Sequence, residues 1–111
     1  MRPLDQLEQT IAARKAAGEA DQSYTARLLG GGVAKIGGKV TEEAAEVVEA
    51  AGEPGVEGRE HTVREAADLV YHLLVLLRAR DIPLADVEAE LARRFAMSGL
   101  EEKASRRPSE S

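Results

Sequence analysis

Two short segments of this 111-residue chain each carry closely spaced acidic side chains. The first segment holds Glu42, Glu43 and Glu46, and the second holds Glu65 and Asp68. Carboxylates three or four residues apart lie on one side of an α-helix, so each segment predicts a patch of negative charge. Two such helices side by side would form a site for a hard divalent cation such as Mg²⁺, which takes carboxylate oxygens, waters and substrate phosphates as ligands. The pattern therefore favours chemistry on a phosphorylated substrate.

The composition predicts one small domain built from helices. Hydrophobic residues make up 43% of the chain but aromatic residues only 3%, so the core must consist of Ala, Val, Leu and Ile. The absence of cysteine excludes disulfides, thiolate zinc sites and cysteine nucleophiles. A net charge of −5 with interleaved signs and no basic stripe argues against a nucleic-acid partner. The N-terminal residues carry no apolar signal segment, and the longest apolar run, over 69–77, is too short to span a membrane, so we expect a cytoplasmic protein with no membrane partner.

Apolar residues recur with a 3.6-residue period in every long segment, which predicts an all-α bundle of about four to five helices. Long helices are expected over residues 3–18, 33–51 and 60–80 and from Leu84 onwards, with a helical turn over 24–29 and a loop over 52–59. Ser23 is expected to cap the turn, and the glycines at 30–32 to end it as a flexible joint. Residues 1–106 are expected to form a single domain, followed by a flexible polar tail at 107–111.

The helix expected over 33–51 carries one charged stripe beside its apolar face. At about 100° per residue, the stripe contains Lys35, Lys39, Glu42, Glu43 and Glu46. A solvated face with helix ion pairs explains Glu42 well. It explains Glu43 less well, because that residue lies at the border of the apolar face, where desolvation of a carboxylate becomes costly.

The helix expected over 60–80 is apolar around almost its whole circumference. Glu65, Asp68 and His72 occupy the one polar gap. A helix that is apolar all round is a buried helix, and carboxylates within it must be paired, protonated or bound to metal. Metal binding is favoured here, and an ion pair with Arg64 or Arg27 is the structural alternative.

The two histidines carry little functional signal. His72 follows Asp68 by one turn and is expected to be a satisfied core residue rather than a proton-transfer group. His61 falls in the loop or the first turn of its helix. The three glycines at 30–32 are not a phosphate-binding P-loop, because no Gly-Lys-Ser/Thr follows them.

The paired acidic clusters resemble the Glu-Glu-x-x-Glu and Glu-x-x-Asp signature of the all-α, MazG-type nucleoside polyphosphate pyrophosphohydrolases. Further segments narrow this resemblance to the phosphoribosyl-ATP pyrophosphohydrolase family. They include Ser-Tyr-Thr-Ala-Arg-Leu-Leu at 23–29, Tyr-His-Leu-Leu-Val-Leu-Leu at 71–77 and Ser-Gly-Leu-Glu-Glu-Lys-Ala-Ser-Arg at 98–106. The resemblance covers most of residues 4–106.

The resemblance implies a hydrolase of L-histidine biosynthesis, acting at its second step. Its substrate would be phosphoribosyl-ATP, whose α–β phosphoanhydride is cut to give phosphoribosyl-AMP and pyrophosphate, with Mg²⁺ as cofactor. By the same resemblance, the metal ligands would be Glu43, Glu46, Glu65 and Asp68. The catalytic set would be Glu43 and Glu46 together with Glu42, which would add a ligand or orient the attacking water. The residues that would bind substrate phosphates are Arg27, Lys35, Lys39, Lys103 and Arg106.

A homodimer is expected for two reasons. Members of the family are helical homodimers, and the helix over 60–80 is too apolar to be covered by so few other helices. Two alternatives remain open. One is a related pyrophosphohydrolase for ordinary or damaged nucleoside triphosphates, which would not require segments 23–29 and 98–106. The other is a non-catalytic helical dimerisation module whose carboxylates form structural ion pairs.

Overall fold

The computed structural model describes residues 1–96, which form helices and turns and contain no strand. The elements are α1 (Pro3–Ala17), the short 3-10 helix η1 (Gly18–Ala20), α2 (Tyr24–Ala51), α3 (Gly55–Ala79) and α4 (Leu84–Phe95). The all-α prediction is confirmed for this part of the chain. None of these helices is both long enough and apolar enough to cross a membrane. The predicted tail at 107–111, and with it Lys103 and Arg106, lies outside the described residues.

The start and end of α1 and the start of α2 follow from local backbone chemistry. Pro3 occupies the first turn of α1, where its missing N–H costs nothing. Gly18 follows the helix with φ +58°, a conformation that glycine adopts readily. The predicted cap of α2 is confirmed, because the Ser23 hydroxyl accepts a hydrogen bond from the Ala26 backbone N–H at 3.1 Å.

Two predicted boundaries needed correction. The turn over 24–29 and the helix over 33–51 are parts of α2, joined by a kink at Gly32, where φ is +82° and ψ is 178°. Helix α3 begins at Gly55 rather than at Glu60, so most of the predicted loop over 52–59 is helical. Gly58 permits this tight connection, because a Cβ at that position would lie 2.1 Å from the Glu53 carbonyl oxygen.

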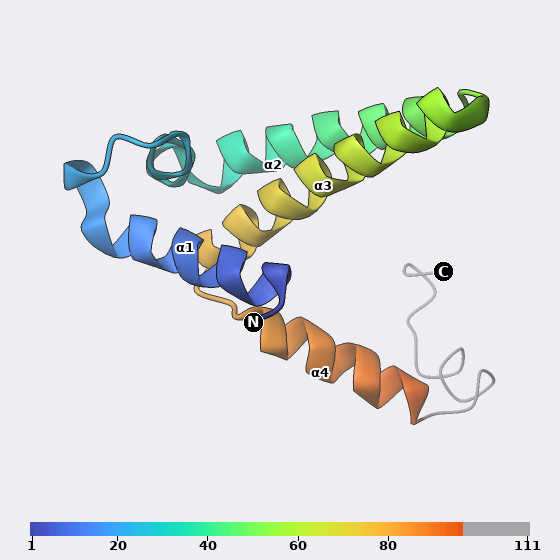
Figure 1. Ribbon diagram of the computed structural model, residues 1–111. Helices are drawn as coiled ribbons and strands as arrows, with labels where there is room; N and C mark the ends of the chain where they lie inside the picture. The colour runs from blue at the N-terminus through green and yellow to red at the C-terminus, as the bar shows by residue number, and fades with distance from the viewer. Residues whose placement is uncertain (97–111) are drawn as a thin grey trace.

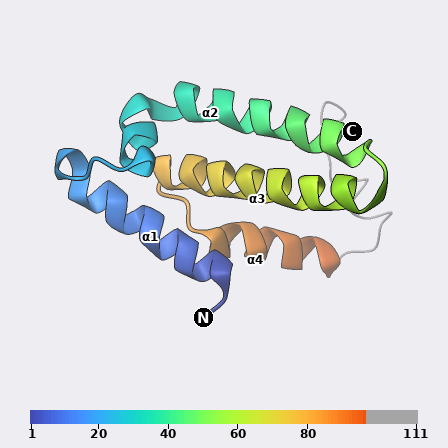
Figure 2. The same ribbon diagram turned by 45° about the horizontal axis from the view of Figure 1, so that its top comes forward.

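Helices α2 and α3 lie side by side and antiparallel for most of their length, as both views show (Figures 1 and 2). Helix α1 packs against both of them. The core of the described region is aliphatic and consists of Ile11, Leu28, Ile36, Leu74 and Val75. Helix α4 makes few contacts with the other helices. Its first backbone N–H, that of Leu84, donates to a carboxylate oxygen of Glu8 on α1.

Within residues 1–96, part of the apolar surface of α3 is exposed, as expected for a helix too apolar to be covered by so few others. Val63, Val70 and Leu73 are 56%, 38% and 42% exposed, whereas Leu74 and Val75 are buried. The reason is geometric, because α2 and α1 cover only part of the circumference of α3. A row of apolar side chains on α3 is therefore left uncovered within residues 1–96.

Candidate metal centre

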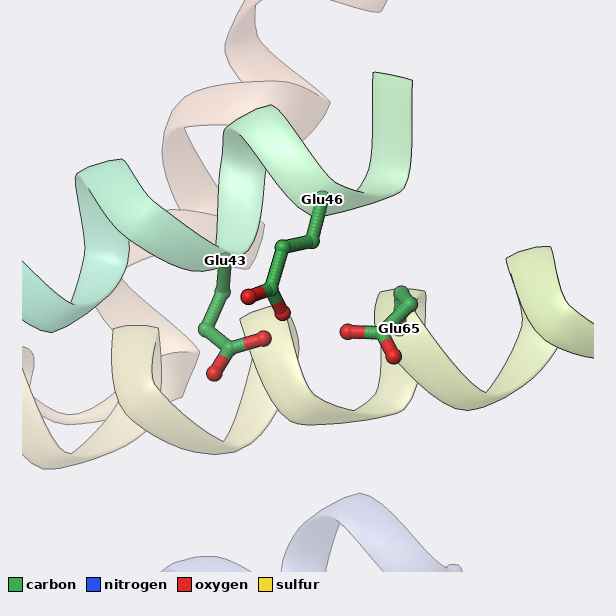
Figure 3. A group of neighbouring side chains, drawn as sticks. All are labelled: Glu43, Glu46 and Glu65. Atoms are coloured by element: carbon green, nitrogen blue, oxygen red, sulfur yellow. The ribbon is translucent and has the colours of Figure 1, made fainter. Parts of the chain in front are cut away.

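The antiparallel packing of α2 and α3 brings three acidic side chains together. Glu43 and Glu46 extend from α2 toward α3, and Glu65 extends from α3 to meet them (Figure 3). One carboxylate oxygen from each lies within 4.8 Å of the others. The structure therefore places three of the four predicted metal ligands in one cluster, which we call the acidic trio.

The acidic trio lacks the partners that a stable group of carboxylates requires. The Oε2 atoms of Glu43 and Glu65 are buried and have no hydrogen-bond partner. Desolvation raises the pKa of Glu43 from 4.5 to about 7, and a hydrogen bond with Glu46 and the negative charges of Glu46, Asp68 and Glu65 act in the same direction. In the absence of a cation, the Glu43 carboxyl therefore holds its proton more tightly than an ordinary glutamate.

The structural alternative of a buried ion pair with arginine finds no support here. Arg27 instead donates from Nη1 to the backbone carbonyl of Gln22 at 2.7 Å. Within residues 1–96, neither Arg27 nor Arg64 forms an ion pair with the acidic trio. The one ion-pair contact of the trio in this region joins Glu65 to a histidine. A strong protein cation that would neutralise the trio is thus missing from the described part of the chain.

The remaining predicted acidic residues, Asp68 and Glu42, are not members of the trio. Asp68 is exposed, and its negative charge contributes to the raised pKa of Glu43. Glu42 is also exposed and forms an ion pair with Lys39, with Nζ and Oε2 3.5 Å apart. This contact agrees with the solvated-face interpretation of Glu42.

The predicted substrate-binding cations are divided between two places. Lys35 and Lys39 are on α2, the helix that supplies Glu43 and Glu46. Arg27 lines a separate cavity of about 300 Å³ between α1, η1 and the start of α2, beside Arg14 and Lys15. No member of the acidic trio lines that cavity, so the structure does not bring Arg27 to the trio.

His72 is a satisfied core residue, as the sequence predicted. It is 6% exposed, and its Nδ1 lies 2.8 Å from the backbone carbonyl oxygen of Asp68. Because a carbonyl can only accept, Nδ1 carries the hydrogen and Nε2 accepts from the Tyr24 hydroxyl at 3.1 Å. His72 thereby connects the start of α2 to α3 and uses both of its ring nitrogens in doing so.

His61 is the residue that the sequence analysis missed. Its Nδ1 lies 2.8 Å from Oε1 of Glu53, and its Nε2 lies 3.4 Å from Oε1 of Glu65. The hydrogen bond with Glu53 is the main reason that the pKa of His61 is raised. The available signal was the four-residue spacing between His61 and Glu65, which places both on one helix face. The spacing was overlooked because His61 was assigned to the loop or the first turn of its helix.

The donor set of the trio suits a hard divalent cation. All of the ligand atoms are carboxylate oxygens, which Mg²⁺ prefers, whereas thiolates are absent from the chain. A bound cation would stabilise the buried oxygens of Glu43 and Glu65, which have no hydrogen-bond partner. Asp68, which is exposed, is a further carboxylate close enough for its charge to act on Glu43.

Comparison with known proteins agrees with this chemistry. Residues 4–95 match the family model described as phosphoribosyl-ATP pyrophosphohydrolase. A phosphoribosyl-ATP pyrophosphatase of Rhodopirellula baltica is 53% identical over 104 residues, covering 94% of this chain and 86% of the relative. The protein of the same name from Trichlorobacter lovleyi is 55% identical over 104 residues, covering 94% and 93% of the two chains. The match therefore extends over nearly the full length of both relatives.

Proposed function

Because this chain belongs to the phosphoribosyl-ATP pyrophosphohydrolase family, we propose that it hydrolyses phosphoribosyl-ATP to phosphoribosyl-AMP and pyrophosphate in L-histidine biosynthesis. The observation that carries this proposal is the acidic trio, with two buried carboxylate oxygens that have no partner. Such a site suits a metal-dependent reaction on a polyphosphate. It does not suit a purely structural role, because an unneutralised acidic cluster destabilises the fold that contains it.

Mg²⁺ is the proposed cofactor, and when bound it supplies neutralisation of phosphate charge and a lowered pKa for bound water. Glu43, Glu46 and Glu65 would hold it, since their ligand atoms already lie within 4.8 Å of one another. Asp68 would act from the exposed edge, as a further ligand on the side from which substrate enters. Glu42 would orient the attacking water or add a ligand.

The substrate phosphates require cations near the trio. Lys39 is one turn before Glu43 on α2, and Lys35 is one turn before Lys39. Both are candidates for phosphate binding, and Lys39 would exchange its ion pair with Glu42 for a phosphate oxygen. Since an acidic surface repels a polyphosphate, these lysines and the metal would together reverse the local field.

A homodimer is part of the proposal. Its support is the apolar surface that residues 1–96 leave uncovered on α3 and α4, which includes Val63, Val70, Leu73, Leu91 and Phe95. Light scattering at micromolar concentration should give the mass of two chains. A monomer mass would contradict this part of the proposal.

The function is tested by pyrophosphate release with Mg²⁺, using phosphoribosyl-ATP against a panel of nucleoside triphosphates. Phosphoribosyl-ATP should be the preferred substrate, and a preference for an ordinary or damaged triphosphate would redirect the assignment to that class of pyrophosphohydrolase. Glu46→Gln and Asp68→Asn should abolish release. Glu49→Gln, an identical charge change at an exposed position of α2, is the matched control and should retain activity.

Thermal unfolding of the same variants separates ligands from ion-pair partners. If Glu46 and Asp68 are metal ligands, the neutral variants should leave the metal-free fold as stable as before or more so, and should remove the Mg²⁺-dependent rise in Tm. If they are partners of buried arginines, the variants should destabilise the fold by about 3–5 kcal/mol. Retained activity with that loss of stability would refute the catalytic assignment.

A further inference from the structure

We infer that His61, anchored by Glu53, is a positioning residue that orients Glu65 for metal binding. The inference rests on the proposed metal site and adds two residues to it. Neither residue belongs to the acidic trio, and the sequence pattern assigned a role to neither of them.

The geometry is that of a ring held from both sides by carboxylates. His61 Nδ1 lies 2.8 Å from Glu53 Oε1, and His61 Nε2 lies 3.4 Å from Glu65 Oε1. Nδ1 forms a hydrogen bond with Glu53, whereas Nε2 faces Glu65 in an ion-pair contact that is longer than a typical hydrogen bond. The ring therefore joins the turn that follows α2 to the first half of α3.

The two carboxylate oxygens of Glu65 have different surroundings. Oε1 faces His61, whereas Oε2 is buried and has no partner. The terminal torsion of a glutamate is broad, so a free carboxylate would sample many orientations. The His61 ring beside Oε1 restricts that rotation and keeps the side chain directed toward Glu43 and Glu46, the arrangement drawn in Figure 3.

The anchor on the other side is itself fixed by the backbone. The Cα of Gly58 packs so closely on Glu53 that a Cβ would meet the carbonyl oxygen of Glu53 at 2.1 Å and its carbonyl carbon at 2.6 Å. This contact sets where Glu53 lies relative to α3. Outer-sphere donors to metal-binding carboxylates typically contribute 10- to 100-fold in metal affinity, so the expected effect is measurable.

A purely electrostatic role for His61 predicts the opposite result. A positively charged ring beside a metal ligand repels the incoming cation, so its removal would tighten metal binding. A positioning role predicts weaker binding when the ring is removed. The sign of the change in affinity thus decides between the two.

The experiment is a titration of the metal-free full-length protein with Mn²⁺, with free ion measured by electron paramagnetic resonance. His61→Ala should weaken binding by about tenfold. His61→Gln, whose amide can still donate to Glu65, should recover part of that loss. Glu53→Gln should weaken binding more than Glu57→Gln, a matched charge change in the first turn of α3 that removes no contact with His61.

The double variant Glu53→Gln/His61→Ala tests whether Glu53 acts through His61. Glu53→Gln should add little to His61→Ala, because the anchor has no function once the ring is absent. Binding by His61→Ala that equals or exceeds that of the wild type, with an unchanged circular dichroism spectrum, would overturn the inference while leaving the proposed function intact. If the wild type itself bound no Mn²⁺, the proposed metal site would fail and the inference with it.

Discussion

The free energy of unfolding of the metal-free protein should fall as pH rises from about 5 to 8, because Glu43 binds its proton more tightly in the folded chain than in the unfolded chain. The pKa of Glu43 increases from 4.5 to about 7 on folding, a difference of about 2.5. Between these values the unfolded chain has lost the proton and the folded chain keeps it, so stability decreases with pH. The loss is nearly complete at about pH 8, one unit above the folded-state pKa.

The size of the effect follows from the same shift. At about 1.4 kcal/mol per pKa unit, a shift of about 2.5 corresponds to an upper limit of about 3 kcal/mol. Small movements of Glu43 away from Glu46 and Glu65 would reduce the repulsion, so a loss of about 2 kcal/mol is the working expectation. Such a loss is a large part of the stability of a small domain.

The assay is urea unfolding in EDTA at several pH values, for the wild type and for Glu43→Gln. The variant cannot ionise, so its stability should depend much less on pH. His61 contributes in the same direction, since its raised pKa gives stability at low pH that is lost as pH rises through the folded-state value. His61→Gln is therefore measured alongside to separate the two groups. A wild-type stability that is flat or rises over this range would refute the reasoning, as would an unchanged slope in Glu43→Gln.

Two further predictions concern helix connections. Gly58→Ala should destabilise the protein by about 1–3 kcal/mol, because the new Cβ would overlap the Glu53 carbonyl. Gly38→Ala is the control, because a Cβ at that position meets no neighbouring atom. It should be neutral or stabilise α2 by up to about 1 kcal/mol. Thermal unfolding of both variants checks the pair, and equal effects would contradict the packing argument. Glu8→Ala removes the acceptor for the Leu84 N–H at the start of α4, so the amide protons of α4 should exchange faster while those of α2 do not change. Equal protection of α4 in the variant and the wild type would show that this contact does not hold the helix.

The sequence predicted the helix content and the grouping of the carboxylates because both depend on short-range periodicity. Spacings of three and four residues place Glu43, Glu46 and Glu65 on definite helix faces, and two antiparallel helices then bring those faces together. The kink at Gly32 was predicted only as a joint, since a run of three glycines does not indicate which one takes the positive φ.

Predictions from the sequence failed where tertiary contacts determine the local structure. Glycine and proline at 52–59 indicated a loop, yet the packing of Gly58 on Glu53 allows α3 to begin at Gly55. Which apolar residues of α3 stay exposed could not be predicted, because helical periodicity gives the apolar surface of a helix but not which neighbours cover it. The role of His61 depends on Glu53, a residue in the turn whose position only the folded chain defines.

The short connection between α2 and α3 also bears on how quickly the molecule can assemble. All three members of the acidic trio come from helices that are adjacent in the chain, so forming the cluster requires closing only a short loop. A helical hairpin with such local contacts belongs to the class of structures that fold fast. Mutual repulsion among the carboxylates opposes that step, and a divalent cation would remove the opposition. If this hairpin is part of the folding nucleus, Mg²⁺ should increase the refolding rate as well as decrease the unfolding rate.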